Sequence, residues 1–182
     1  STPTTGASSY NYAYYSNGKL FLVNYTHLSA TGINAPHDLE LNITGTNSYT
    51  ATGGTALYVI GDLTVSGNGS LTVSGAYNGV IADTFIPKGG QFTAISTNTA
   101  SDSAFKALSV SSVNLANIPS YVKLGNTDSD VTGAVLYNDA NRSSYDYVSF
   151  EPYVLSIGGI EIGDGDYLLP GATATTEILP SG

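Results

Sequence analysis

The chain has 182 residues, of which 41% are hydrophobic and only 10% are charged, and its formal net charge is −9. Five basic residues cannot form the patch that a phosphate backbone requires, so the composition excludes a nucleic-acid-binding surface. Cysteine is absent, which excludes disulfides, thiolate zinc sites and thiol nucleophiles. No run approaches 18 apolar residues, so we expect no membrane-spanning helix.

Residues 1–16 form a tail that carries no charged side chain. Tyr10, Tyr12 and Tyr14 alternate in it at strand spacing, so the three rings would share one face of an extended segment. Such a segment is suited to join another sheet as an added strand. Methionine is absent from the whole chain, and we expect Ser1 to be a processed N-terminus from which a signal peptide has been removed.

Two strands are predicted next in the chain. Residues 19–28 are apolar on both faces, as in a buried strand. In residues 38–45, Leu39, Leu41 and Ile43 alternate with polar residues, which predicts a half-exposed strand. The same alternation places Asn42 on the outward face.

Residues 61–75 contain the sequence Leu-Thr-Val-Ser twice, at 63–66 and at 71–74. We predict a β-hairpin whose turn is formed by residues 67–70, with Asn68 at the tip, because the turn glycines can adopt positive φ. The alternative is two rungs of a solenoid, but a solenoid needs a repeat of about 20 residues or more, and no sustained period is evident outside this stretch. Residues 61–73 also resemble the β-helical carbohydrate-binding modules of bacterial cell-surface proteins.

Strand patterns continue to the end of the chain, with turn signals about every 8 to 12 residues. The one expected helix is a turn or two near residues 101–110, where serines could cap it. This spacing predicts an all-β fold, an antiparallel β-sandwich of Ig-like or jelly-roll type. We assign residues 17–182 to the sandwich and residues 1–16 to an extended N-terminal tail strand; whether there is one sandwich or two is left open.

Residues that could support catalysis are few. His27 and His37 lack a neighbouring nucleophile or acid pattern, and no catalytic or phosphate-binding motif is present, so we expect no enzyme activity and no cofactor. Alternating aspartates in two loops could coordinate calcium through carboxylate oxygens, although neither loop matches the twelve-residue calcium motif. These residues are Asp128, Asp130, Asp164 and Asp166.

Four Asn-x-Ser/Thr triplets are acceptors for N-linked glycans, a modification of exposed loops in exported proteins. They begin at Asn24, Asn42, Asn68 and Asn141. Export and the low charge both agree with this interpretation, and we therefore predict covalent N-glycans.

The Ser/Thr/Tyr-rich tail, the series of strands, the four glycan acceptors and the scarcity of charge, Cys and Met together resemble the archaeal thread filament subunit family. That resemblance implies a glycosylated extracellular pilin in which the N-terminal strand of one subunit fills an open groove in the sandwich of the next. An incomplete sandwich exposes backbone groups and apolar core, and a donated strand satisfies both. Because donor and groove lie on different surfaces, the contact propagates into a filament of identical subunits.

The sequence therefore favours a structural subunit of an extracellular, pilus-like filament for adhesion or biofilm contact, with Tyr10, Tyr12 and Tyr14 as the inserting side chains. The C-terminal residues 172–182 are an alternative donor. The alternative function is a secreted or cell-surface polysaccharide-binding module on a sandwich or β-helix, dependent on calcium if the four aspartates bind it.

Overall fold

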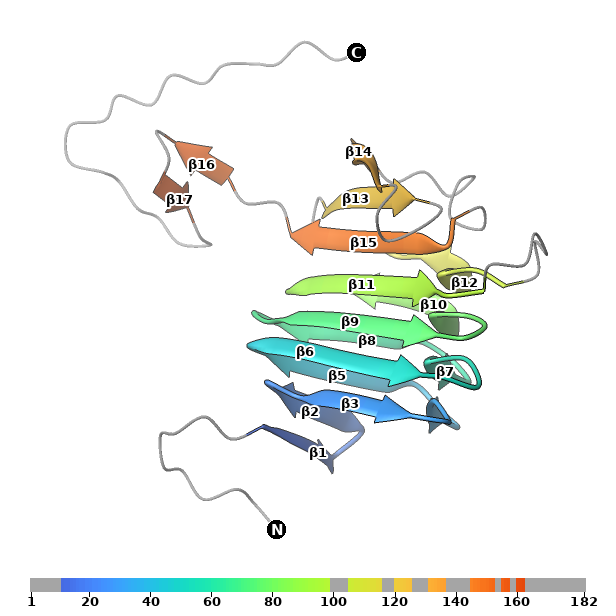
Figure 1. Ribbon diagram of the computed structural model, residues 1–182. Coiled ribbons are helices and arrows are strands. Elements are labelled where there is room, and N and C mark those ends of the chain that lie inside the picture. The colour runs from blue at the N-terminus through green and yellow to red at the C-terminus, as the bar shows by residue number, and fades with distance from the viewer. Residues whose placement is uncertain are drawn as a thin grey trace.

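The computed structural model describes residues 11–98, 105–115, 120–125, 131–136, 145–152, 155–157 and 160–162. The fold is all-β, as predicted, but the predicted sandwich is wrong: the strands wind into a β-solenoid (Figure 1). Parallel pairing shows this directly, because β2, β5, β8 and β10 all run in the same direction beside one another. A hairpin-built sandwich would pair them antiparallel.

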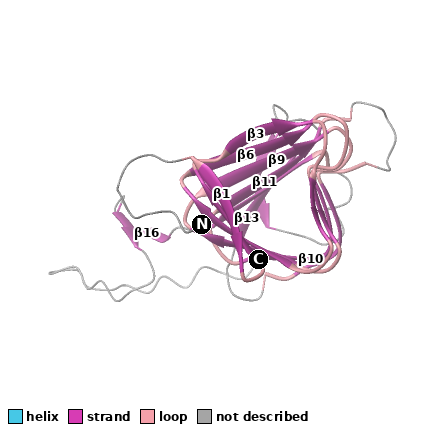
Figure 2. Cartoon of the chain, turned by 90° about the horizontal axis from the view of Figure 1, so that it is seen from below, coloured by secondary structure: helices cyan, strands magenta, loops and turns pink. Residues whose placement is uncertain are grey.

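Each turn of the solenoid contributes one strand to each of three faces, and the view along the stack shows these faces enclosing the interior (Figure 2). Face 1 contains β2 (Lys19–Val23), β5 (Leu39–Thr44), β8 (Leu63–Gly67) and the second half of β10 (Val80–Pro87). Face 2 contains β3 (Thr26–Ser29), β6 (Thr46–Ala51), β9 (Ser70–Gly75) and β11 (Gln91–Ser96). Face 3 contains β4 (Ile33–Ala35), β7 (Leu57–Val59), the first half of β10 and β12 (Leu108–Val113).

The predicted hairpin at residues 61–75 is also wrong. Its two Leu-Thr-Val-Ser segments are β8 and β9, which lie on different faces and do not pair with each other. Residues 68 and 69 form the corner that takes the chain from face 1 to face 2. The two segments are therefore consecutive sides of one turn, neither a hairpin nor two rungs.

Period-2 alternation fills the interior, because inward side chains of successive turns stack in columns. Leu39 pairs with Leu63, which pairs in turn with Phe85, and all three are buried. The Phe85 ring centroid lies 4.9 Å from that of Phe92 and 4.9 Å from that of Phe150. Each turn thus buries its apolar residues against the turns on either side, and this stacking holds the solenoid together.

The two ends of the stack are built differently. At the N-terminal end, β1 (Tyr12–Ser16) turns back through Asn17 and Gly18 and pairs antiparallel with β2. Toward the C-terminal end, β11 pairs with the antiparallel strand β15 (Tyr147–Pro152), and β13 (Ser120–Gly125) and β14 (Val131–Leu136) extend face 2 further. A separate two-stranded sheet consists of β16 (Leu155–Ile157) and β17 (Ile160–Ile162).

The helix expected near residues 101–110 is not formed where this stretch is described. Leu108 begins β12, which pairs in parallel with β10. Leu108 is fully buried in the core. Its strand conformation is therefore set by packing in an apolar column, and this packing outweighs the local helix-capping signal.

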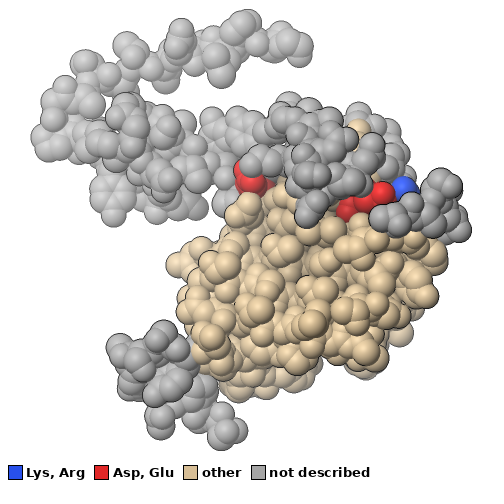
Figure 3. Space-filling model, in the orientation of Figure 1, with Lys and Arg blue, Asp and Glu red and all other residues tan. Residues whose placement is uncertain are grey.

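The described surface carries few charges, as the composition predicts. The face in Figure 3 is almost entirely neither acidic nor basic, and its few charged groups lie near the border with residues that are not described. Two ion pairs connect neighbouring strands or loops of the described chain, Lys19 with Glu40 at 2.9 Å and Lys106 with Asp146 at 3.4 Å.

Candidate functional site

The corner between faces 1 and 2, called here the glycine corner, is formed by residues 24–25, 45, 68–69 and 88–90. Backbone hydrogen bonds connect its successive levels. Ser70 N–H donates to the Gly45 carbonyl at 2.8 Å, and Gln91 N–H donates to the Gly69 carbonyl at 2.9 Å. The sheet ladders therefore continue around the corner without interruption.

Glycine is required at this corner, and at Gly67 directly before it, for two reasons. Gly67 has a φ of +105°, and a Cβ there would lie 2.2 Å from the Ile43 carbonyl oxygen. A Cβ on Gly69 would lie 2.4 Å from the Gly45 carbonyl oxygen. Both distances are far inside van der Waals contact, so the backbones of adjacent turns approach closely only because these side chains are missing.

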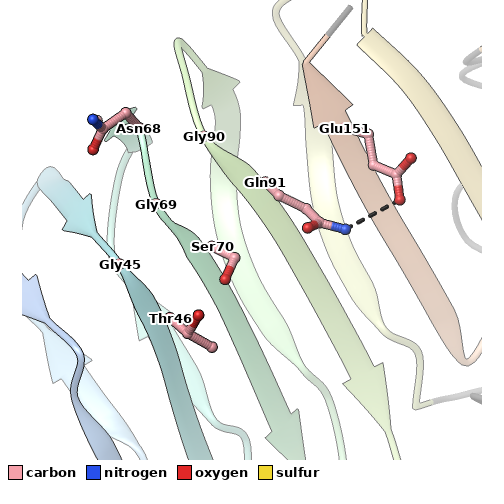
Figure 4. A pocket seen from close by; sticks show the side chains of 9 residues that line it. Gly45, Thr46, Asn68, Gly69, Ser70, Gly90, Gln91 and Glu151 are labelled. Carbon is pink, nitrogen blue, oxygen red and sulfur yellow. Dashed lines mark hydrogen bonds between the residues drawn. The ribbon is translucent and has the colours of Figure 1, made fainter. Parts of the chain in front are cut away.

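The missing side chains leave a groove of about 800 Å³ along the glycine corner (Figure 4). Thr46, Ser70 and Gln91 come from the successive strands β6, β9 and β11, and Glu151 comes from β15. The Gln91 side-chain amide donates to Glu151 Oε1 at 3.1 Å. The complete lining is Gly45, Thr46, Gly67, Asn68, Gly69, Ser70, Gly90, Gln91 and Glu151.

The lining residues other than glycine all carry hydroxyl, amide or carboxylate groups, and no aromatic residue belongs to the lining. These groups exchange hydrogen bonds with neutral polar molecules. The groove therefore suits a sugar held by hydrogen bonds rather than by stacking on an aromatic ring.

Asn68 lies at the margin of the groove. Its side chain is exposed and points away from the strands (Figure 4), while its backbone N–H donates to the Ile43 carbonyl at 3.1 Å. Within the described part of the chain, its side-chain amide makes no hydrogen bond. This triplet thus combines a fixed backbone with a free side-chain nitrogen.

The other two described acceptors have engaged side chains. Asn24 adopts a positive φ of 47°, and its Oδ1 accepts a hydrogen bond from Thr46 N–H at 3.2 Å. Asn42 points outward from β5, as predicted, but is half-buried between β2 and β8, and its Nδ2 donates to Ser66 Oγ at 3.2 Å. Asn141 lies outside the described residues.

The predicted inserting tyrosines are placed on the chain's own β1. Tyr12 pairs with Val23, and the Tyr14 ring stacks on Phe21 with centroids 5.4 Å apart. Both tyrosines are half-buried on the outer side of face 1, and Tyr10 lies outside the described residues. The sandwich groove that these residues were expected to fill does not exist in a solenoid.

A second pocket, of about 410 Å³, lies at the N-terminal end of the stack. Inward-facing residues of the first turn line it because no further turn lies below them in the described chain. Tyr15 is 64% exposed there, and Leu20 and Ile33 are half-buried. The complete lining is Tyr15, Leu20, Ile33, Asn34, Ala35, Pro36, His37, Asp38 and Leu39.

The remaining candidate residues do not assemble into a described site. His37 lines the end pocket, and the His27 ring lies beside those of Tyr25 and Tyr49, with centroids 5.8 and 5.5 Å away. Among the described residues, no three His, Asp or Glu side chains gather as a metal site would require. The calcium candidates Asp128, Asp130, Asp164 and Asp166 lie outside the described residues.

Comparison with protein families, with curated proteins and with solved structures found no match to the chain. In the described residues, no helix has the length and apolar character needed to cross a membrane.

Proposed function

We propose that the protein is a structural subunit of an extracellular, pilus-like filament that serves adhesion or biofilm contact. One observation carries the proposal: the N-terminal end of the solenoid presents three strand edges, β1, β3 and β4, that no described strand covers, and those of β3 and β4 end the parallel ladders of faces 2 and 3. Natural β-proteins usually protect such edges, because an exposed edge is a template for pairing with another chain.

The backbone groups on these edges can be identified from the pairing. In a parallel ladder, alternate residues direct both N–H and C=O toward the same neighbour. The carbonyls of Tyr25 and Ser29 accept from β6 and the residue that follows it, so Thr26 and Leu28 between them face the open edge. By the same reasoning Asn34 faces the open edge of β4, because Ile33 N–H and the Ala35 carbonyl bond toward the next turn.

Apolar surface at this end adds a second driving force. Leu28 on β3 is 69% exposed and Tyr15 is 64% exposed, beside the end pocket. Tyr15 lies in the inward column of Leu20 and Leu41, so a further turn stacked on the end would bury it. Leu28 lies in the outward column of Thr50, which is half-buried, so the same turn would cover it in part. Burial of apolar area favours association by about 25 cal/mol per Å².

The opposite end supplies a different surface. Face 2 ends there in β14, which is antiparallel to β13, while it ends in β3 at the N-terminal end. A contact between β3 of one copy and β14 of the next is heterologous, so it repeats without closing and produces a filament. This arrangement needs neither the sandwich nor its donated strand. Because β1 pairs with β2 of the same chain, we assign the intermolecular contact to the β3 and β4 edges rather than to residues 1–16.

The proposed location follows from the surface chemistry. A nearly uncharged exterior rich in hydroxyl and amide groups, together with exposed glycan acceptors, agrees with an exported glycoprotein that works outside the cell. The partners are then identical subunits in a homopolymer.

Negative-stain electron microscopy of wild type and variants tests the proposal. Leu28→Pro removes the outward N–H of β3 and leaves the bonds to β6 intact, since Leu28 does not donate to that strand. Leu28→Thr is the matched control, because it removes the same apolar side chain and retains the N–H. We expect filaments from wild type, fewer or shorter ones from Leu28→Thr, and folded monomers from Leu28→Pro. Filaments from Leu28→Pro as abundant as those of Leu28→Thr would refute this contact, and wild-type protein that stays monomeric at all concentrations would refute the function.

A polysaccharide-binding module is the second candidate, and the polar groove at the glycine corner favours it. In that case isolated monomer would bind a neutral polysaccharide, and Gln91→Ala would weaken the binding. Glycan-array measurements with and without a chelator separate the two proposals, because a filament subunit needs no free glycan as ligand. Loss of binding on chelation would assign a calcium requirement.

A further inference from the structure

The three described glycan acceptors differ in how their side-chain nitrogens are placed. N-glycosylation replaces a hydrogen on Asn Nδ2 by a bulky sugar, so that nitrogen must be accessible and there must be space beside it. Asn42 Nδ2 donates to Ser66 Oγ in the middle of a parallel sheet, with strands on both sides. A sugar there would break this bond and displace a half-buried side chain.

Asn24 is held in a different way. Its Oδ1 caps Thr46 N–H of the next turn, and a Cβ on Gly45 would lie 2.0 Å from that oxygen and 3.3 Å from Nδ2. The side chain is therefore folded back over Gly45 and packs against the corner. The Asn24 side chain thus connects the first turn of the solenoid to the second.

Asn24 and Asn68 are both exposed, but Asn24 is held by its Oδ1 bond, whereas the Asn68 side chain makes no hydrogen bond within the described residues and has open space beside it. The groove of about 800 Å³ begins at this residue and continues past Thr46, Ser70 and Gln91. Their hydroxyl and amide groups can hydrogen-bond a sugar lying along the corner. Within the described residues the Ser70 hydroxyl, the third element of the triplet, makes no hydrogen bond and remains available to the transferring enzyme.

We infer that Asn68 is the N-glycosylated residue among the three described acceptors, with the first sugars of its glycan lying in the groove of the glycine corner. The donor is an oligosaccharide carried on a lipid phosphate. Asn68 Nδ2 forms a bond to the anomeric carbon, and the bond from that carbon to the phosphate oxygen breaks. The lipid phosphate leaves with the electron pair, and one Nδ2 proton is released to solvent. The inference rests on the extracellular location in the proposed function.

Intact-mass measurement of protein secreted by its source cells tests the assignment by difference. Ser70→Ala removes the hydroxyl of the triplet, whereas Ser70→Thr keeps an acceptor of the same kind. We expect Ser70→Ala to lose the mass of one whole glycan and Ser70→Thr to retain it. Thr44→Ala and Thr26→Ala, which destroy the triplets of Asn42 and Asn24, are expected to change the mass only by the substitution itself.

Each result decides between the alternatives. An unchanged glycan mass in Ser70→Ala, or a lost glycan in Thr44→Ala or Thr26→Ala, would overturn the inference. A glycan at Asn141 cancels in every comparison. Amide hydrogen exchange tests the contact between the glycan and the groove. Exchange at residues 45–46 and 69–70 should be slower in glycosylated protein than after enzymatic removal of the glycan, and equal exchange would overturn the placement.

The inference and the proposed function can fail separately. Filaments of unglycosylated subunits would refute this inference alone, and glycosylated monomers would refute the proposed filament alone.

Discussion

Asn47 provides the strongest test of how polar groups stabilise this solenoid. Its side chain lies on the inward face of β6 and is only 2% exposed. Nδ2 donates to the carbonyls of Ser70 at 3.0 Å, Thr44 at 3.1 Å and Gly45 at 3.3 Å, and Oδ1 accepts from Tyr25 N–H at 2.9 Å. One amide thus connects three consecutive turns beside the glycine corner.

The perturbation is Asn47→Leu, which keeps a similar volume and places a leucine above Leu71 in the adjacent position of the column. The substitution leaves Tyr25 N–H and the Ser70 carbonyl without their side-chain partner. Each buried group left unsatisfied costs about 1 to 3 kcal/mol, so the two together cost about 4 kcal/mol at the middle of the range, and the added apolar contact returns about 1 to 2 kcal/mol. We therefore expect a net loss of about 2 to 3 kcal/mol in the free energy of unfolding.

Urea denaturation followed by circular dichroism measures this loss, with an unchanged m-value showing that the same surface is exposed on unfolding. Asn42→Leu is the matched control, because it removes a single half-exposed hydrogen bond from the neighbouring strand and should cost less than about 1 kcal/mol. An Asn47→Leu variant at least as stable as wild type would show that apolar stacking alone holds the turns together, and would refute the reasoning.

Two further predictions concern the backbone and the core. Gly67→Ala should lower the free energy of unfolding by about 1 to 3 kcal/mol, because the φ of Gly67 is +105° and the new Cβ would meet the Ile43 carbonyl. Gly54→Ala is the control, because a Cβ there has open space, and it should be neutral or slightly stabilising. Equal denaturation midpoints for the two variants would contradict this prediction. Phe85→Leu should cost about 1 to 3 kcal/mol by thermal or urea unfolding, because Phe85 is fully buried against two other rings, and Leu fills less of that space. A change below about 0.5 kcal/mol would indicate that the aromatic cluster repacks without loss.

The sequence predicts strands well here, because period-2 alternation depends only on which side chains are buried. Leu39, Leu41 and Ile43 were expected on the inward face and are buried there. Alternation does not specify the partner strand, however, and a two-glycine bridge is as compatible with a solenoid corner as with a hairpin turn. The pairing direction was therefore the part of the fold that local pattern could not determine.

A signal for the solenoid is present in the sequence, although it is weak. Asp38 and Leu39 recur as Asp62 and Leu63, and the two segments pair in register 24 residues apart. The spacing shortens in the next turn, where Leu63 pairs with Phe85. A column requires only an apolar side chain of suitable volume, so the same residue does not recur in each turn. The length of the repeat also varies, because the corners contain different numbers of residues.

The candidate site was predictable only in part. The triplet at Asn68 is evident from the sequence, but the groove beside it arises from glycines in three different turns. Asn47 was missed because a lone asparagine among threonines and serines carries no signal of burial. Its role becomes visible only when the carbonyls of adjacent turns are brought around it.

The inequality of the two ends gives the molecule a direction. A stack that grows by adding whole copies at the β3 and β4 edges, while β14 ends face 2 at the opposite end, would be polar along its axis, with two different ends. Every copy would then expose the same column of amides and glycines. Any sugar carried there would recur once per copy along the fibre.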